Sequence, residues 1–243
     1  MVQNGAKLRK ADMTLTQDFL DKYTEFETFI KNRNNVGKFE KSDILNDKVL
    51  KRNRNLWEFY RNLRNLLTHE PDVRNGNYVI LTQKLYDDFS RDVDRIMHPK
   101  TALNIAVKES SIYKVKQGEI ISNVIETMLE KNYTCTPIVD NTEKLIGVFS
   151  SHSLMLYFNK YKDGIVEEPQ KATIADLIEF CSLDENKEIE YKFVAKTCDE
   201  YYIKDLFKKS LVDKKRLEAL FVTENGHSSE KLLGIITHWD LDK

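Results

Sequence analysis

The chain has 243 residues, of which 41% are hydrophobic and 32% are charged, a composition typical of a soluble globular protein with room for two domains. Its 38 basic and 39 acidic residues give a formal net charge of −1, so a general electrostatic affinity for nucleic acid is not implied. We expect no membrane span and no signal peptide, because no apolar run is long enough and residues 1–10 lack an apolar region.

The cysteines and histidines favour neither disulfides nor a metal site. Cys135, Cys181 and Cys198 are widely spaced and form no Cys-x-x-Cys pair. This usage predicts reduced thiols and a cytoplasmic protein. The five histidines show no metal-ligand spacing, so we expect no metal.

Residues 12–97 are predicted to be all-helical, after a flexible tail over residues 1–11. The first helix is indicated by apolar residues at helical spacing, namely Leu15, Phe19, Tyr23, Phe26 and Ile30, and turn residues at 32–37 end it. A second helix is predicted from Ser42 or Asp43 to about His69, because Pro71 disfavours helical geometry at the preceding residue. A polar loop follows at 72–77, and a third helix ends before Pro99.

Strand patterns begin at Thr101. The first half is predicted to have β-rich pieces at 101–105 and 112–115, a helix at 120–131, strands at 136–139 and 145–149, and a helix at 150–161. Residues 162–169 read as a linker. The second half is predicted to have helices at 173–180 and 202–211, strands at 193–195, 219–222 and 232–236, and one last helical turn.

An internal repeat connects these halves. Residues 143–153 and 230–240 each read as an apolar strand broken by one glycine, then a hydroxyl residue, then a helix. Ser150 and Thr237 are predicted N-caps, and Asp240 is placed to complete a capping box. A second interpretation adds a ligand, since free amides at a helix start suit a phosphate and a nearby carboxylate suits ribose hydroxyls.

The segment from Gly234 to Asp240 resembles the Gly-x-x-Thr-x-x-Asp signature of CBS domains, and residues 133–140 resemble the strand that precedes it in that family. The resemblance implies an α+β chain in which a helical bundle precedes a tandem CBS pair of two βαββα-type modules, at 98–162 and 163–243. It also implies a cleft that binds an adenine nucleotide as a regulatory ligand, with no cofactor required. The implied ligand-binding residues are Thr134, Thr136, Ser150, Ser153, Thr237 and Asp240. Ser153 stands where the first module would have its Asp, which speaks against a second nucleotide.

The end of the second helix carries Arg64, Asn65 and His69, which resemble the Arg-x4–6-His motif of HEPN domains. These are all-α domains that commonly dimerise, and many are metal-independent ribonucleases. The resemblance covers residues 12–97 and implies His69 as acid or base, with Arg64 and Asn65 at the phosphate. The two outer residues are roughly 140° apart on an ideal helix, so we do not expect them to converge neatly. In the alternative interpretation His69 caps the helix and Arg64 pairs with a carboxylate.

Residues 48–64 contain six basic side chains against Glu58 alone, which indicates either a phosphate-binding face or a solvated one. The sequence therefore predicts a homodimeric regulator whose CBS pair binds an adenine nucleotide and controls the helical domain. That domain is either a metal-independent endoribonuclease acting on RNA or a non-catalytic module that binds a protein partner. A third hypothesis makes the CBS pair a structural dimeriser with an empty cleft.

Overall fold

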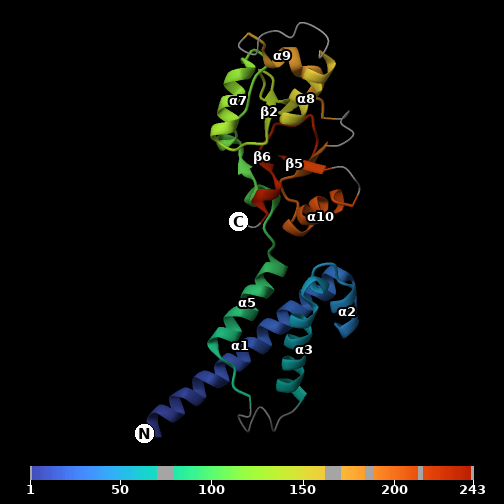
Figure 1. Cartoon of the computed structure of the whole chain (residues 1–243). Coiled ribbons are helices and arrows are strands. Elements are labelled where there is room, and N and C mark those ends of the chain that lie inside the picture. Colours follow the sequence, from blue (N-terminus) through green and yellow to red (C-terminus); the bar gives the residue numbers. More distant parts are fainter. Residues whose placement is uncertain (1, 70–78, 162–170, 184–188, 213–215, 242–243) are drawn as a thin grey trace. The chain divides into compact units, whose positions relative to one another are not determined.

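A computed structural model describes residues 2–69, 79–161, 171–183, 189–212 and 216–241 (Figure 1). The chain divides into two compact units, residues 1–99 and residues 100–243. The loop predicted at 72–77 and the linker predicted at 162–169 lie outside the described residues.

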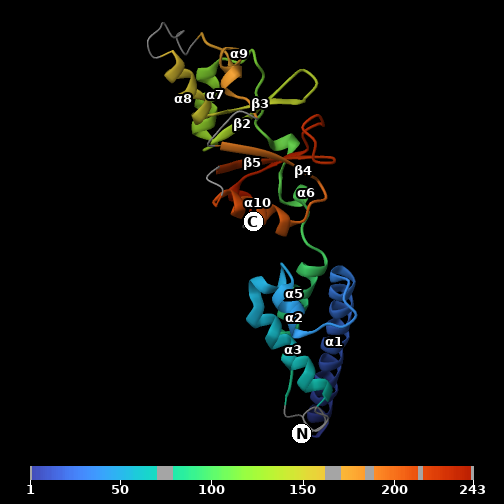
Figure 2. The ribbon, with the colours of Figure 1, turned by 90° about the vertical axis from the view of Figure 1, so that its right-hand side faces the viewer.

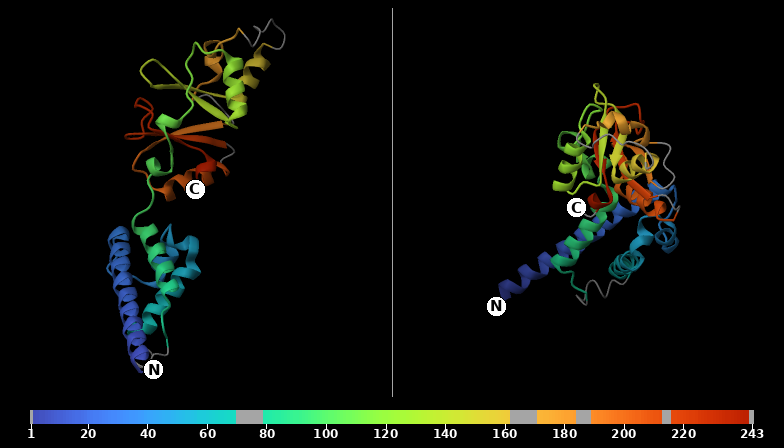
Figure 3. Two further views of the ribbon diagram at one scale, coloured as in Figure 1. Left: turned by 90° about the vertical axis from the view of Figure 1, so that its left-hand side faces the viewer. Right: turned by 45° about the horizontal axis from the view of Figure 1, so that its top comes forward.

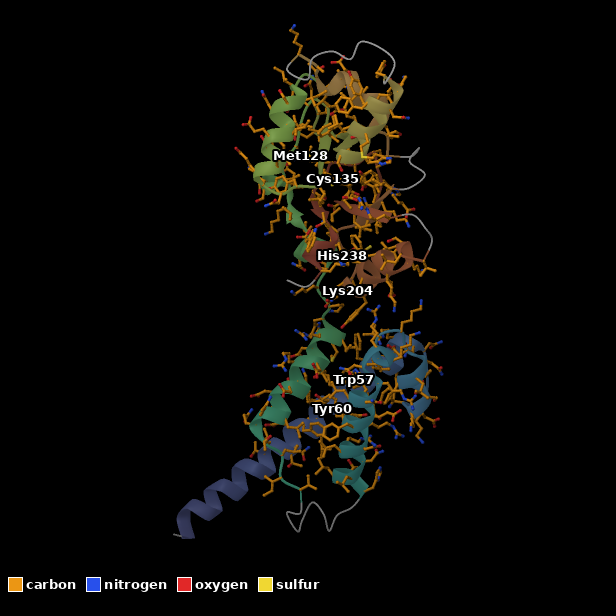
Figure 4. All side chains as sticks on the ribbon, viewed as in Figure 1. Trp57, Tyr60, Met128, Cys135, Lys204 and His238 are labelled. Atoms are coloured by element: carbon orange, nitrogen blue, oxygen red, sulfur yellow. The ribbon has the colours of Figure 1, made fainter. Side chains whose placement is uncertain are left out.

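The described part of the first unit contains helices and no strand, as predicted. Its elements are α1 (Val2–Asn34), α2 (Lys41–Asn46), η1 (Leu50–Asn53), α3 (Arg54–His69) and α5 (Gln83–Met97). Aromatic rings fill the space between α1, α3 and α5: Phe19 and Tyr60 each lie against Phe89, with ring centroids 4.5 and 4.8 Å apart, and Phe26 stacks on Trp57 at 4.8 Å. Figure 4 labels Trp57 and Tyr60 in this core. Aromatic side chains bury the most area per residue, so this cluster holds the helices together.

Two helix boundaries differ from the prediction. The first helix begins at Val2, so it runs through the segment expected as a tail at residues 1–11. The sequence there is rich in strong helix formers such as Ala6, Leu8 and Lys10, which extend a helix without an apolar stripe. The second predicted helix is divided into α2, η1 and α3.

Asp47 causes the division. Its Oδ1 accepts hydrogen bonds from the amides of Val49 (2.8 Å) and Leu50 (3.0 Å), which turns the chain before α3. Its Oδ2 accepts from Asn34 at 3.1 Å and pairs with Arg33, both at the end of α1. Burial acts to raise the pKa of this carboxyl, but the bonds from Leu50 and Asn34 and the charge of Arg33 outweigh it, so the pKa is lowered.

The second unit contains two sheets. Its first half comprises α6 (Ala102–Ile105), β1 (Val107–Lys108), η2 (Glu109–Ser111), α7 (Ile121–Glu130), β2 (Cys135–Val139), β3 (Leu145–Ser150) and α8 (Ser151–Lys160). Its second half comprises α9 (Ile174–Leu177), η3 (Ile178–Phe180), β4 (Ile189–Ala195), α10 (Glu200–Ser210), β5 (Arg216–Thr223), β6 (Gly234–Ile236) and η4 (His238–Asp240). One sheet has the order β1-β6-β5-β4, with β4 parallel to β5, and β2 pairs with β3 in the other. Figures 2 and 3 show α10 against β5.

The prediction of a β-rich piece at residues 101–105 is wrong, because this segment forms the helix α6. Asn104 accepts from the amide (3.2 Å) and the hydroxyl (2.7 Å) of Thr101, and this capping box starts α6. The second β-rich prediction, at 112–115, is reduced to one parallel bridge between Val115 and Ile138. The strand lies earlier, at β1, where Val107 pairs with Ile235.

The two halves of the second unit exchange their first helices. Helix α9 lies beside α8 of the first half (Figure 1). Its Ile174 and Leu177 share a core with Val124 and Phe149. Helix α6 packs on the second half, where Ala102 shares a core with residues of α10 and β5. Equivalent bridges mark both exchanges, Ile120 with Thr173 and Thr101 with Asp199. Neither half is therefore complete alone.

The repeated glycines make room for the exchanged segments. A Cβ added at Gly147 would lie 2.8 Å from the Cys181 carbonyl oxygen, and one added at Gly234 would lie 2.7 Å from the Ala106 Cβ. Hydrogen bonds accompany these contacts, from the Val148 amide to the Cys181 carbonyl and from the Glu109 amide to the Leu233 carbonyl, each 2.9 Å long. The glycine in each repeat thus permits a close approach between the halves.

We expect Gly147→Ala and Gly234→Ala each to lower the free energy of unfolding by about 1–3 kcal/mol, because the added methyl must displace a packed neighbour. Gly118→Ala is the matched control, since a Cβ there meets nothing within 4 Å. Urea unfolding of the three variants measures the difference. Equal stability of all three would contradict the close approach.

The carboxyl group of Asp47 is expected to make the stability of the fold depend on pH. Its lowered folded pKa means that it stabilises the fold above the ordinary Asp pKa and that this contribution disappears as pH falls through the folded value. Wild type should therefore lose more stability than Asp47→Asn between about pH 5 and pH 3, as followed by urea unfolding. Asp87→Asn, at an exposed position on α5, should track wild type. Parallel loss in wild type and Asp47→Asn would refute this role.

Candidate functional site

Two cavities lie side by side in the second unit. The larger, of about 830 Å³, is bounded by α7, α8, β5, α10 and η4. The smaller, of about 280 Å³, is bounded by residues 107–113, the start of β2 and η4. Both are lined by Tyr133, Thr134, Thr237 and Trp239. The cavities therefore share a rim at the second copy of the repeat.

Thr237 and Asp240 form the predicted capping box. Asp240 Oδ2 accepts from the Thr237 amide at 2.9 Å and from the Thr237 hydroxyl at 2.8 Å. The carboxylate is 5% exposed, and it also lines the smaller cavity. The same two groups thus fix the start of η4 and form part of the cavity wall, so capping does not exclude contact with a ligand.

The equivalent residues of the first half, Ser150 and Ser153, are joined by hydrogen bonds of their own. The Ser153 hydroxyl accepts from the Ser150 amide at 2.8 Å and donates to the Ser150 carbonyl at 2.7 Å. Ser150 lines the larger cavity, whereas Ser153 is 2% exposed and lines neither. The carboxylate that faces a cavity at Asp240 has no counterpart here.

The two predicted threonines of the β2 region, Thr134 and Thr136, differ in exposure and in whether they line a cavity. Thr134 is exposed and lines both cavities. Thr136 is fully buried, lines neither, and donates its hydroxyl to the Tyr113 carbonyl at 2.6 Å. Thr136 therefore holds in place a segment that lines the smaller cavity.

Most of the first half of this unit matches a known family model. Residues 106–160 match the family model of the CBS domain. No curated protein matches the chain. With that match, and with the same order of elements in both halves, the chain is a helical region followed by a CBS-pair fold of α+β class.

Several solved CBS structures resemble the chain at low identity. CBSX2 in complex with AMP is 20% identical over 58% of this chain and 92% of its own, with a TM-score of 0.41. CBSX2 from Arabidopsis thaliana, solved separately, is 18% identical over 59% and 92%, with the same TM-score of 0.41. The CBS domain pair of protein MJ0100, in complex with 5′-methylthioadenosine and S-adenosyl-L-methionine, is 15% identical over 59% and 93%, with a TM-score of 0.40.

The sequence did not predict several of the residues that line the two cavities, among them Tyr133, Trp239, Arg216 and His238. Tyr133 and Trp239 lie on the shared rim, while Arg216 and His238 line the larger cavity. Figure 4 labels His238. Arg216 is bonded to Glu218 at 2.5 Å with its side chain 68% exposed. His238 and Trp239 occupy the two variable positions of the Thr-x-x-Asp motif. The motif therefore predicts where they lie in the chain, but it does not predict that their side chains line a cavity.

Cys135 lines the smaller cavity, but its side chain is mostly buried. Burial raises the pKa of its thiol to about 12, so it stays protonated near neutral pH. Burial likewise raises the pKa of Cys181 to about 11. Both residues belong to apolar cores.

The first unit contains a separate hollow of about 640 Å³, lined by Arg64, Asn65 and His69 together. All three residues thus line one hollow, although we did not expect Arg64 and His69 to converge neatly. Arg64 is held in place: it donates to Glu27 of α1 and to Asn65, each at 3.1 Å, and its guanidinium lies 5.6 Å from the centre of the Tyr23 ring. The carboxylate partner of the alternative interpretation is therefore present.

Within the described ranges, no cluster of three or more His, Cys, Asp or Glu side chains is placed to hold a metal ion. None of the described helices has the length and apolar character needed to cross a membrane.

Proposed function

We propose that the CBS pair binds an adenine nucleotide as a regulatory ligand, at the junction of its two cavities. The observation that carries this proposal is the position of Thr237 and Asp240, which line a rim common to both. The Gly-x-x-Thr-x-x-Asp pattern and the family match over residues 106–160 support it.

The chemistry of the two cavities fits the two ends of a nucleotide. The smaller, of about 280 Å³, suits a nucleoside, and Asp240 there is an acceptor for ribose hydroxyls. The larger cavity offers Arg216 and His238, together with Ser150 and Ser151 at the start of the ten-residue helix α8. Guanidinium forks and helix starts both favour phosphate.

Regulation requires that the ligand binds two states of the protein with different affinity. We propose that the protein is a homodimer and that nucleotide binding shifts how its two helical domains meet across the dimer. Exchange of α6 and α9 makes the CBS pair one cooperative body, so a ligand at the rim stabilises both halves together.

AMP, ADP or ATP at about a hundred times its dissociation constant should stabilise the folded protein by roughly 2.7 kcal/mol, which a thermal melt detects as a raised midpoint. Asp240→Ala should abolish the shift. Asp176→Ala is the matched control: Asp176 accepts from the Thr173 amide (2.7 Å) and hydroxyl (2.9 Å) in the same way, but it lines neither cavity. Absence of any shift in wild type, or a full shift in Asp240→Ala, would refute the proposal.

The hollow of the helical unit supports a second function, cleavage of RNA without a metal. Lys31, Lys38 and Arg61 line it beside Arg64, while Glu27 is its one acidic lining residue among those described. Such a cationic hollow favours phosphate, and His69 at the end of α3 is the side chain suited to proton transfer. The alternative is a non-catalytic unit that binds a protein partner.

Cleavage of a fluorescent single-stranded RNA in the presence of a chelator tests the second function. His69→Ala should lower the rate by about 100-fold or more, since that is the typical contribution of a general acid or base. His98→Ala, at a residue outside the hollow, should keep the wild-type rate. Equal rates in wild type and His69→Ala, or no cleavage by wild type, would leave the non-catalytic alternative.

A further inference from the structure

Trp239 is an exposed aromatic side chain at the point where the two cavities meet. It is 79% exposed and lines both. The chain has only two tryptophans, and the other, Trp57, is 5% exposed and stacked on Phe26. The indole of Trp239 therefore contributes little to the core of the fold.

The backbone that carries Trp239 is nevertheless fixed. It lies between His238 and Asp240 in η4, and the double hydrogen bond of Asp240 to Thr237 closes this turn. An ordered backbone with a solvent-exposed indole presents a flat apolar face at a constant place. Such a face needs no rearrangement of its backbone to receive a planar group.

Tyr133 forms a second aromatic wall of the same rim. It is 40% exposed, lines both cavities, and packs on Tyr113 with ring centroids 6.4 Å apart and planes 25° apart. Its amide donates to the Met128 carbonyl at 2.8 Å, which fixes it at the end of α7. Lys131 lies over the Tyr113 ring at 5.8 Å and lines the smaller cavity.

We propose that Trp239 is the stacking surface for the base of the ligand, with Tyr133 as the neighbouring wall. This inference rests on the proposed function, and it adds which side chains hold the base of the nucleotide, so that a phosphorylated sugar alone would lack this contact. Aromatic side chains stack on nucleobases and contribute substantially to affinity.

The first half of the CBS pair lacks this surface. His152 occupies the position equivalent to Trp239, and it lines neither cavity. Ser153 stands in place of Asp240 there, so the stacking surface and the carboxylate occur together in one copy. This coincidence assigns one base-stacking site to each chain.

Calorimetric titration of the full chain with AMP and with ribose 5-phosphate tests the assignment. AMP should bind at least about ten-fold more tightly than ribose 5-phosphate, and Trp239→Leu should weaken AMP by about ten-fold or more while leaving ribose 5-phosphate unchanged. Tyr202→Leu is the control, because Tyr202 is 51% exposed on α10 but lines neither cavity.

Fluorescence adds a direct readout. In a Trp57→Phe background, Trp239 is the only tryptophan, and AMP should change its emission whereas ribose 5-phosphate should not. AMP binding with wild-type affinity to Trp239→Leu would overturn the stacking role and leave the proposed function intact. A changed oligomeric state in Trp239→Leu with unchanged AMP affinity would overturn it in favour of a contact between copies. No binding of AMP to wild type would overturn both proposals.

Discussion

The close approach of the exchanged segments to Gly147 and Gly234 is the constraint on which the second unit depends. Each glycine lies where the chain of the other half passes within van der Waals distance, and any side chain would separate them. Gly234 begins β6, three residues before Thr237. The contact that joins the two halves therefore also sets the position of the turn that lines both cavities.

The capping boxes show that the same short motif can lie beside a cavity in one place and serve only as a helix cap in another. Thr173 and Asp176 make the same two hydrogen bonds as Thr237 and Asp240, with the same spacing, at the start of α9. Of the two pairs, it is Thr237 and Asp240 that line the cavities described above, and Thr173 and Asp176 line neither of them. The Thr-x-x-Asp pattern thus predicts a helix start wherever it occurs, and its meaning for ligand binding depends on which side chains fold against it.

Sequence reasoning succeeded where one local rule decides the structure. The apolar runs of β2, β3, β5 and β6 are buried on folding, and the stripe of α5 ends before Pro99 as the backbone chemistry requires. It failed where a distant contact decides. Asp47 interrupts a helical pattern because Arg33 and Asn34 of another helix bind it, and the exchange of α6 and α9 leaves no periodic signal. The place of Trp239 on the cavity rim could not be predicted for the same reason, because exposure at a rim depends on how distant segments fold together.

A crystal structure of the full chain grown with AMP would show whether the rim around Thr237 and Asp240 receives a nucleotide. We expect electron density for one nucleotide per chain, with its ribose hydroxyls within hydrogen-bond distance of Asp240 and its base against Trp239. Saturating AMP with no density at this rim, or with density only in the hollow beside Arg64, would contradict it.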